Sequence, residues 1–182
     1  MNWCLALAGS LAVLSTASLM PVASAAPTTQ DVPFNGTVAG SCVFSGTVGG
    51  TLGQVMPKYG WVEASGGIPG MAPNLPAGQT MINCNSPAQL STSVPVAVSV
   101  PASFNPQKLQ SLVYDGINYT TAYSGGSTFD SGAWNKPTTP IAIPMGVDVP
   151  LQVGMVAGTR SFTSDVPSGT YEYTVTLTAT PN

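Results

Sequence analysis

The sequence contains no histidine and very few charged residues. Of 182 residues, four are Lys or Arg and seven are Asp or Glu, together 6% of the chain. Without histidine, the commonest general base and the commonest metal ligand are both missing. The net charge of −3 offers no basic surface of the kind that attracts nucleic acids or anionic membranes. We therefore expect no nucleic-acid partner.

The sequence also lacks the motifs around which common enzyme sites are built. It has no Gly-x-Ser-x-Gly elbow, no Walker loop, no G-x-G-x-x-G after a strand pattern and no Ser-x-x-Lys pair. Surface solvation explains the acidic residues, which are scattered along the chain: Asp31, Glu63, Asp115, Asp130, Asp148, Asp165 and Glu172. We expect no catalytic residue, no metal ligand and no cofactor, and hence not an enzyme.

Helix-forming residues are scarce, whereas Val, Thr, Ser and Gly are plentiful. Gly (20) and Pro (17) supply many turns, and 43% hydrophobic residues are enough for a core. The length is that of one domain or a small pair. This balance favours an all-β protein over a helical bundle or a dinucleotide-binding α/β enzyme.

The first 25 residues have the pattern of a secretory signal peptide. An apolar stretch over residues 3–20 is followed by Ala23, Ser24 and Ala25, an A-x-A cleavage pattern. No Lys or Arg precedes the apolar stretch, and a retained membrane anchor is the alternative, although Pro21 weakens it. No later stretch approaches the ~18 apolar residues of a membrane helix, so we expect no membrane insertion of the mature chain.

Two cysteines follow the signal peptide, Cys42 and Cys84. In an exported chain such a pair is expected to form a disulfide. The loop of about 43 residues that it closes makes the bond worth roughly 4 kcal/mol in the chain-entropy model. A metal or redox pair is the alternative, but the two cysteines have no histidine and no C-x-x-C spacing to accompany them.

Alternation of apolar and polar residues predicts antiparallel strands. The clearest is 171–179, followed by 147–155 and by 92–100, which places four valines on one face. Shorter candidates are 48–56, 79–84, 109–114, 117–123 and 141–145. Residues 57–78 and 124–140 are predicted to be long loops. About seven strands separated by turns indicate a two-sheet β-sandwich.

Four aromatic residues lie in or near these loops: Tyr59, Trp61, Tyr123 and Trp134. Such side chains could stack on a sugar ligand. Alternatively, they hold the long loops against the sandwich.

The segment before the first cysteine has an apolar face. Val32, Phe34, Gly36 and Val38 share one parity, whereas polar residues dominate the other. Extended segments at a free chain end can pair with another chain. The alternative is an ordinary first strand within its own sandwich.

Several short motifs, taken in order, resemble those of one family. They are residues 34–38 (FNGTV), 41–42 (SC), 82–84 (INC) and 166–171 (VPSGTY), the last leading into the alternating strand. In an exported chain of this size, this order resembles chaperone–usher pilins. It is most similar to their archaic branch, which groups with spore-coat-U-like domains.

The resemblance implies an immunoglobulin-like antiparallel β-sandwich that lacks a strand and is completed by a donor strand. It divides the chain into a signal peptide (1–25), a donor-strand arm (26–41) and a pilin-like domain (42–182). The expected protein is a structural subunit of an extracellular bacterial fibre, with adhesion or biofilm formation as its role. Its expected partners are related pilin subunits, a periplasmic chaperone and an outer-membrane usher.

A second hypothesis belongs to another functional class. The chain would then be an autonomous secreted β-sandwich that binds carbohydrate, or another surface ligand, through the predicted loops 57–78 and 124–140.

Overall fold

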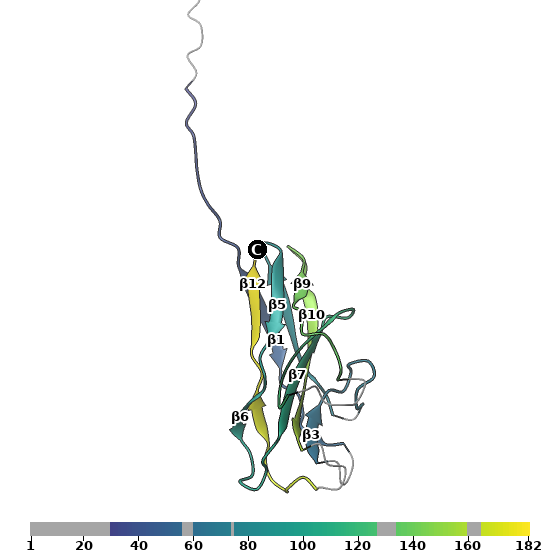
Figure 1. Ribbon diagram of the computed structural model, residues 1–182. Coiled ribbons are helices and arrows are strands. Elements are labelled where there is room, and N and C mark those ends of the chain that lie inside the picture. Colours follow the sequence, from purple (N-terminus) through teal and green to yellow (C-terminus); the bar gives the residue numbers. More distant parts are fainter. Residues whose placement is uncertain (1–29, 56–59, 74, 127–133, 160–164) are drawn as a thin grey trace, which may run out of the picture. The chain divides into compact units, whose positions relative to one another are not determined.

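A computed structural model describes residues 30–55, 60–73, 75–126, 134–159 and 165–182 (Figure 1). The predicted signal peptide, its cleavage site and Tyr59 lie outside these residues. Residues Val38–Asn182 form one compact unit, called the domain below, and residues 30–37 belong to a separate unit.

The described residues form strands and no helix, so none of them lies in a helix that could span a membrane. The strands are β1 (Cys42–Val48), β2 (Gly53–Gln54), β3 (Trp61–Ala64), β4 (Gly78–Cys84), β5 (Ala88–Thr92), β6 (Val96–Ser99), β7 (Lys108–Tyr114), β8 (Tyr119–Ser124), β9 (Ile141–Ile143), β10 (Val149–Gly158), β11 (Glu172–Thr174) and β12 (Leu177–Pro181).

The first layer of the domain is a sheet organised around the long strand β10. One edge of β10 pairs with β4 and then with β3, and its other edge pairs with β7. Strand β1 extends the sheet beyond β4, β8 extends it beyond β7, and β2 extends it beyond β3. All these pairings are antiparallel.

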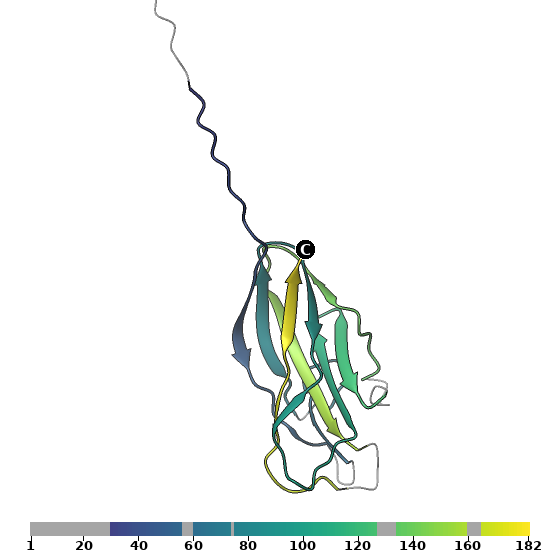
Figure 2. The same cartoon turned by 60° about the vertical axis from the view of Figure 1, so that its left-hand side comes forward.

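The second layer contains the remaining strands. Strand β5 lies between β12 and β9, and β6 pairs with β11. Two hydrogen bonds between Ser93 and Thr176 bridge the gap between these two groups of strands. β5 and β12 lie side by side in both views (Figure 1, Figure 2). The predicted all-β, antiparallel sandwich is therefore confirmed.

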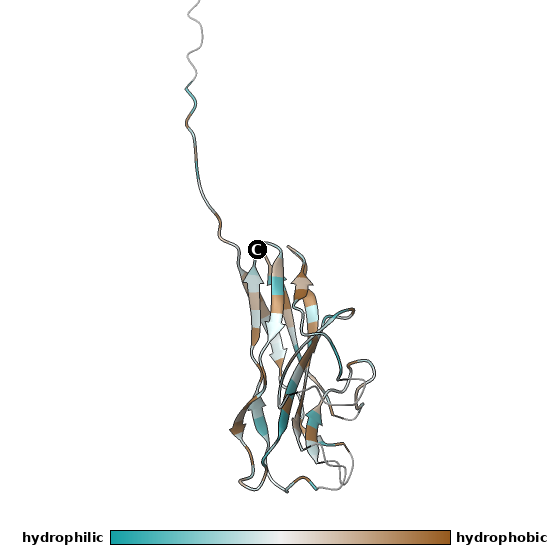
Figure 3. Cartoon of the chain, in the orientation of Figure 1, coloured by the Kyte–Doolittle hydropathy of each residue, from teal (hydrophilic) through white to brown (hydrophobic). Residues whose placement is uncertain are grey.

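The main core lies between the layers because one face of each sheet is apolar. Apolar and polar residues alternate along strands such as β3 and β10 (Figure 3). Buried side chains of both layers form one cluster: Ile82, Cys84, Leu151 and Val113 from the first, and Ala88, Leu90, Ile141 and Ile143 from the second. This alternation with one apolar face per sheet is what positions the two layers.

A second cluster lies on the opposite face of the first layer, beneath loops. Ile68 and Trp134, both from loops, pack there against Leu112 and Val156. Ile68 and Trp134 are each only 3% exposed. The loops that carry them are therefore packed parts of the domain.

Several predicted element bounds are wrong. The predicted loop 57–78 contains β3, and the predicted strand 48–56 contains only the end of β1 and the two residues of β2. The predicted strand 92–100 contains only the last residue of β5 and then β6, and Val96 and Val98 are exposed. Strand 171–179 is divided into β11 and β12, and 147–155 corresponds to the later and longer β10. The predicted count of about seven strands is too low.

Candidate functional site

Two strand edges at opposite ends of the sequence border the candidate site. Among the described residues, β1 pairs only with β4, and β12 pairs only with β5. β11 likewise pairs only with β6. Each of these strands therefore presents backbone N–H and C=O groups along its other edge, where a further strand can bond.

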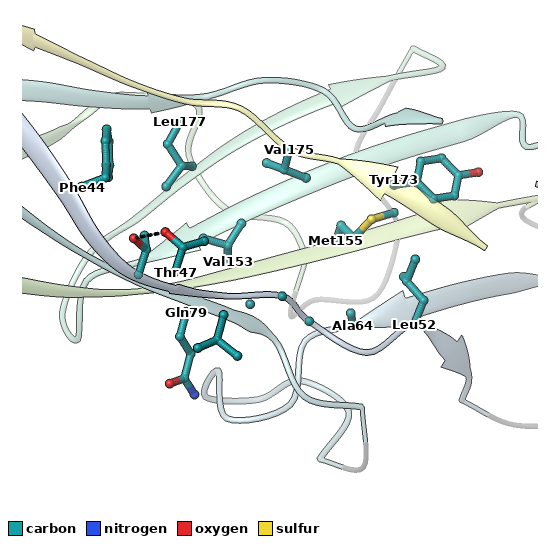
Figure 4. Close-up of a pocket in the computed structure, with 15 residues that line it drawn as sticks. Phe44, Thr47, Leu52, Ala64, Gln79, Val153, Met155, Tyr173, Val175 and Leu177 are labelled. Atoms are coloured by element: carbon teal, nitrogen blue, oxygen red, sulfur yellow. Dashed lines mark hydrogen bonds between the residues drawn. The ribbon is translucent and has the colours of Figure 1, made fainter. Parts of the chain in front are cut away.

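A groove of about 360 Å³ runs between these edges. Its lining is mostly apolar: Phe44, Thr47, Val48, Gly49, Gly50, Leu52, Ala64, Gly78, Gln79, Thr80, Val153, Met155, Tyr173, Val175 and Leu177. Figure 4 shows Phe44 near Leu177 at one end of the groove. Tyr173 lies towards the other end, with Leu52 and Ala64 (Figure 4). The groove thus follows the strand direction for several residues.

Strand β1 is an unusual wall because six of its seven residues are exposed. Phe44 is the residue whose ring reaches into the groove (Figure 4). Large apolar side chains are seldom left exposed along an edge strand unless a partner covers them. Strand β1, which forms one wall of the groove, therefore resembles an interface surface.

A bulge in β1 adds a polar position to the apolar groove. Gly46 has a φ of 63°, and the register shifts between Ser45 and Val48. The hydroxyl oxygens of Thr47 and Thr80 are 3.0 Å apart, and the Thr80 hydroxyl donates to the Ser45 carbonyl at 3.1 Å. Because each hydroxyl has one proton, Thr47 donates to Thr80, and its own oxygen remains an acceptor for a group in the groove.

Tyr173 lines the groove opposite Leu52 and Ala64. Burial, and secondarily the neighbouring Tyr171, raise the pKa of Tyr173 above its ordinary value of 10.0. Its hydroxyl is buried and has no hydrogen-bond partner among the described residues. The neutral form is therefore favoured in the folded protein.

Replacing Tyr173 by Phe is expected to weaken the alkaline destabilisation of the protein. Above pH 10 an unfolded tyrosine has lost its proton while folded Tyr173 still holds it, so the free energy of unfolding falls as pH rises. Tyr173→Phe removes this contribution. Urea unfolding between about pH 8 and 11 measures it, with Tyr123→Phe, a change at the surface, as the control. Identical pH dependence in wild type and Tyr173→Phe would contradict the assignment.

The predicted disulfide is present. Cys42 and Cys84 are directly opposite each other in the register of β1 and β4, and their sulfur atoms are bonded. Cys84 is fully buried in the main core. The bond therefore attaches the exposed strand β1 to the interior.

The residues predicted for the donor strand lie outside every strand of the structure, because β1 begins only at Cys42. Val32 and Val38 are exposed, and Phe34 is 93% exposed. At Gly36 an added Cβ would meet no atom within 4 Å. These four positions therefore carry an apolar row that is not part of the domain core.

The aromatic residues considered for a ligand do not form a common surface. Trp134 is 3% exposed and packs in the cluster beneath the loops, where Trp61 joins it. The indole nitrogen of Trp61 donates to Glu63 at 3.3 Å. Tyr123 is exposed on β8, and Tyr59 lies outside the described residues. Trp61 and Trp134 thus pack within the domain, and neither they nor Tyr123 line the groove.

Sequence reasoning did not identify the residues that line the groove. Its residues come from five separate stretches, of which only the row Tyr173, Val175 and Leu177 stood out as one face of a strand. The described residues contain no group of three or more His, Cys, Asp or Glu side chains that could hold a metal ion. No family model, curated protein or solved structure matches the chain.

Proposed function

We propose that this protein is a structural subunit of a bacterial surface fibre that polymerises by donor-strand exchange. One observation carries the proposal: an apolar groove between the first and last strands of a sandwich, in a chain that also has an exposed arm with an apolar row. The arm of one copy would occupy the groove of the next. The motif order described above supports the same class.

The arrangement of layers supports an immunoglobulin-like sandwich that is short of one strand. The first layer has the order β1, β4, β10, β7 near its centre, and the second has β5 beside β12. A further strand beside β12 would fill the groove and satisfy its free edge. In this account residues 26–41 supply that strand and 42–182 receive it.

The apolar residues of the arm and those that line the groove have the same spacing along the chain. Val32, Phe34, Gly36 and Val38 span seven residues, or roughly 20 Å when extended. Tyr173, Val175, Leu177 and the partly buried Ala179 provide four facing positions over the same length. A strand inserted in this way bonds to the β12 edge and covers the groove floor.

Burial of the row makes the exchange favourable. Each of Val32, Phe34 and Val38 contributes roughly 1.5–3 kcal/mol when it leaves water, or about 5–9 kcal/mol together before ordering costs. Backbone bonds to the open edges add to this. The total is comparable with the stability of a whole domain, so the subunit depends on an occupant of its groove. A periplasmic chaperone would fill the groove first, the arm of the next subunit would then replace it, and an outer-membrane usher would guide this assembly.

One structural feature supports the proposed export of the protein. A disulfide between Cys42 and Cys84 is typical of oxidising compartments. Together with the signal-peptide pattern it favours passage through the periplasm to the cell surface.

A synthetic arm peptide tests the proposal. Exported full-length protein is expected to form polymers, visible by gel filtration and electron microscopy. An excess of peptide 27–40 should cap the open grooves and shorten the polymers, because it competes with the arms of other copies. The same peptide carrying Asp at position 34 is the control and should not cap. A stable monomer that neither polymerises nor binds the peptide would refute donor-strand exchange.

A further inference from the structure

The chain enters the domain through a clamp formed by Asn85. Its Nδ2 donates to the Ala39 carbonyl at 3.1 Å, and its Oδ1 accepts from the Ser41 amide at 2.6 Å. The Asn85 backbone N–H also donates to the Ser41 carbonyl at 3.0 Å. One residue thus makes three hydrogen bonds to the segment 39–41.

Gly40, the central residue of this segment, lies against the end of β12. A Cβ at Gly40 would stand 2.6 Å from Ser86 Oγ and 2.7 Å from Pro181 Cβ. Such distances are too short for any side chain, so the backbone itself packs on these two residues. The segment is therefore fixed both by hydrogen bonds and by close contact, although it belongs to no strand.

This clamp limits how far apart two connected copies can be. Between Val38, the last residue of the apolar row, and Cys42, the first residue of β1, the chain can extend over at most roughly 14 Å. Residues 39–41 use that length along the surface of their own domain. If Val38 lies in the groove of another copy, the two domains must touch or be separated by little more than a layer of side chains.

An apolar rim, formed by Val43, Met81, Met145 and Val147, lies beside the clamp. These side chains are between 40% and 65% exposed. Val43 is opposite Asn83 in the β1–β4 register, and Met145 is bridged to Cys84, so both lie next to the residue pair at which β1 begins.

Next to Val43, the side chain of Asn83 donates to Asp148 at 2.7 Å. The polar pair is therefore already hydrogen-bonded, and the rim can pack without leaving this amide unsatisfied.

We infer that the rim packs against the copy that receives the arm, and that Asn85 fixes the angle between the two domains. The inference rests on the proposed function. A second copy of this chain is the occupant because the arm continues directly into the clamp and the rim, and because the permitted separation brings the receiving domain there. Asn85 acts here as a positioning residue, through the segment that it holds.

Electron microscopy of polymers tests the inference with full-length protein. Asn85→Ala removes the two side-chain hydrogen bonds of the clamp. Met145→Glu places a charge on the rim. Each is expected to lower the persistence length of the fibre at least two-fold. Resistance of unheated polymers to detergent, which reports an inserted arm, should remain. Ile117→Glu is the matched control, because Ile117 is equally apolar and 83% exposed but lies in the turn that follows Asp115.

The possible outcomes distinguish a failure of the rim and clamp inference from a failure of the proposed function. Unchanged persistence length in both Asn85→Ala and Met145→Glu polymers would overturn the rim and clamp inference while leaving the arm exchange intact. Loss of polymers in these variants, with binding of peptide 27–40 retained, would support it, since the contact would then contribute to assembly itself. Wild-type protein that binds no peptide would overturn the proposed function, and this inference with it.

Discussion

Replacing Phe34 by Asp is expected to abolish polymerisation while leaving the domain folded. Phe34 is 93% exposed and lies outside every strand, so its own domain loses no core contact when it changes. In the groove of another copy, the aspartate would be buried against apolar side chains without a partner. That costs several kcal/mol, or roughly a thousand-fold in affinity for about 4 kcal/mol.

The measurement combines fibre length with stability. Electron microscopy reports assembly, and urea unfolding of the monomeric protein reports the free energy of unfolding. Asn35→Asp is the matched control because it introduces the same charge one residue away, on the opposite face of the arm. That variant should polymerise like the wild type.

Two results would contradict the prediction in different ways. Normal fibres from Phe34→Asp would show that the Phe34 side chain does not enter a groove. An unfolded Phe34→Asp monomer would show that residues 32–38 are the first strand of their own sandwich, which was the alternative left open by the sequence.

The fold class was predictable because each sheet has one apolar face, and alternation is visible in the sequence. The prediction of individual strands was wrong where both faces of a strand are covered. In β3, Val62 and Ala64 pack in a cluster with Met155, but Glu63, on the other face of the strand, is also buried. β3 has only four residues, too few for its alternation to stand out, and its Gly-rich and Pro-rich flanks made the whole segment resemble a loop.

The prediction for the strand around the valines of β6 was wrong for the opposite reason. Val96 and Val98 share a face, as predicted, but that face is exposed. A β-branched residue fits a strand wherever it lies, so its identity does not say which face is buried. Pro95 and Pro101 bound the strand, which is shorter than the valine pattern.

The residues that line the groove could not be predicted from the sequence because they depend on strand register. Thr47 reaches the groove only through the bulge at Gly46, and Thr80 reaches it from β4. Met155 and Tyr173 approach from opposite layers. A shift of one residue in any of these strands would turn the lining side chains away from the groove. The arm, in contrast, is one contiguous segment, and its apolar row could be read directly.

Removal of the disulfide is expected to have the second large effect. Replacing both Cys42 and Cys84 by Ala should lower the free energy of unfolding by about 4 kcal/mol, because the unfolded chain loses a constraint on a loop of 42 residues. That is a large part of the ~5–15 kcal/mol typical of a domain. Urea unfolding of the variant and of the wild type measures the difference.

Removal of the disulfide should weaken peptide binding to the groove by more than the loss of stability alone would. Strand β1 pairs with β4 only and is mostly exposed, so few apolar contacts hold this wall in place. Without the bond to buried Cys84, β1 should separate from the sheet, and binding of peptide 27–40 should be lost even where the rest of the domain is folded. Val43→Ala, an exposed change on the same strand, is the control and should cost less than about 0.5 kcal/mol. A double variant that binds the peptide as the wild type does would show that hydrogen bonds to β4 are sufficient to hold the wall.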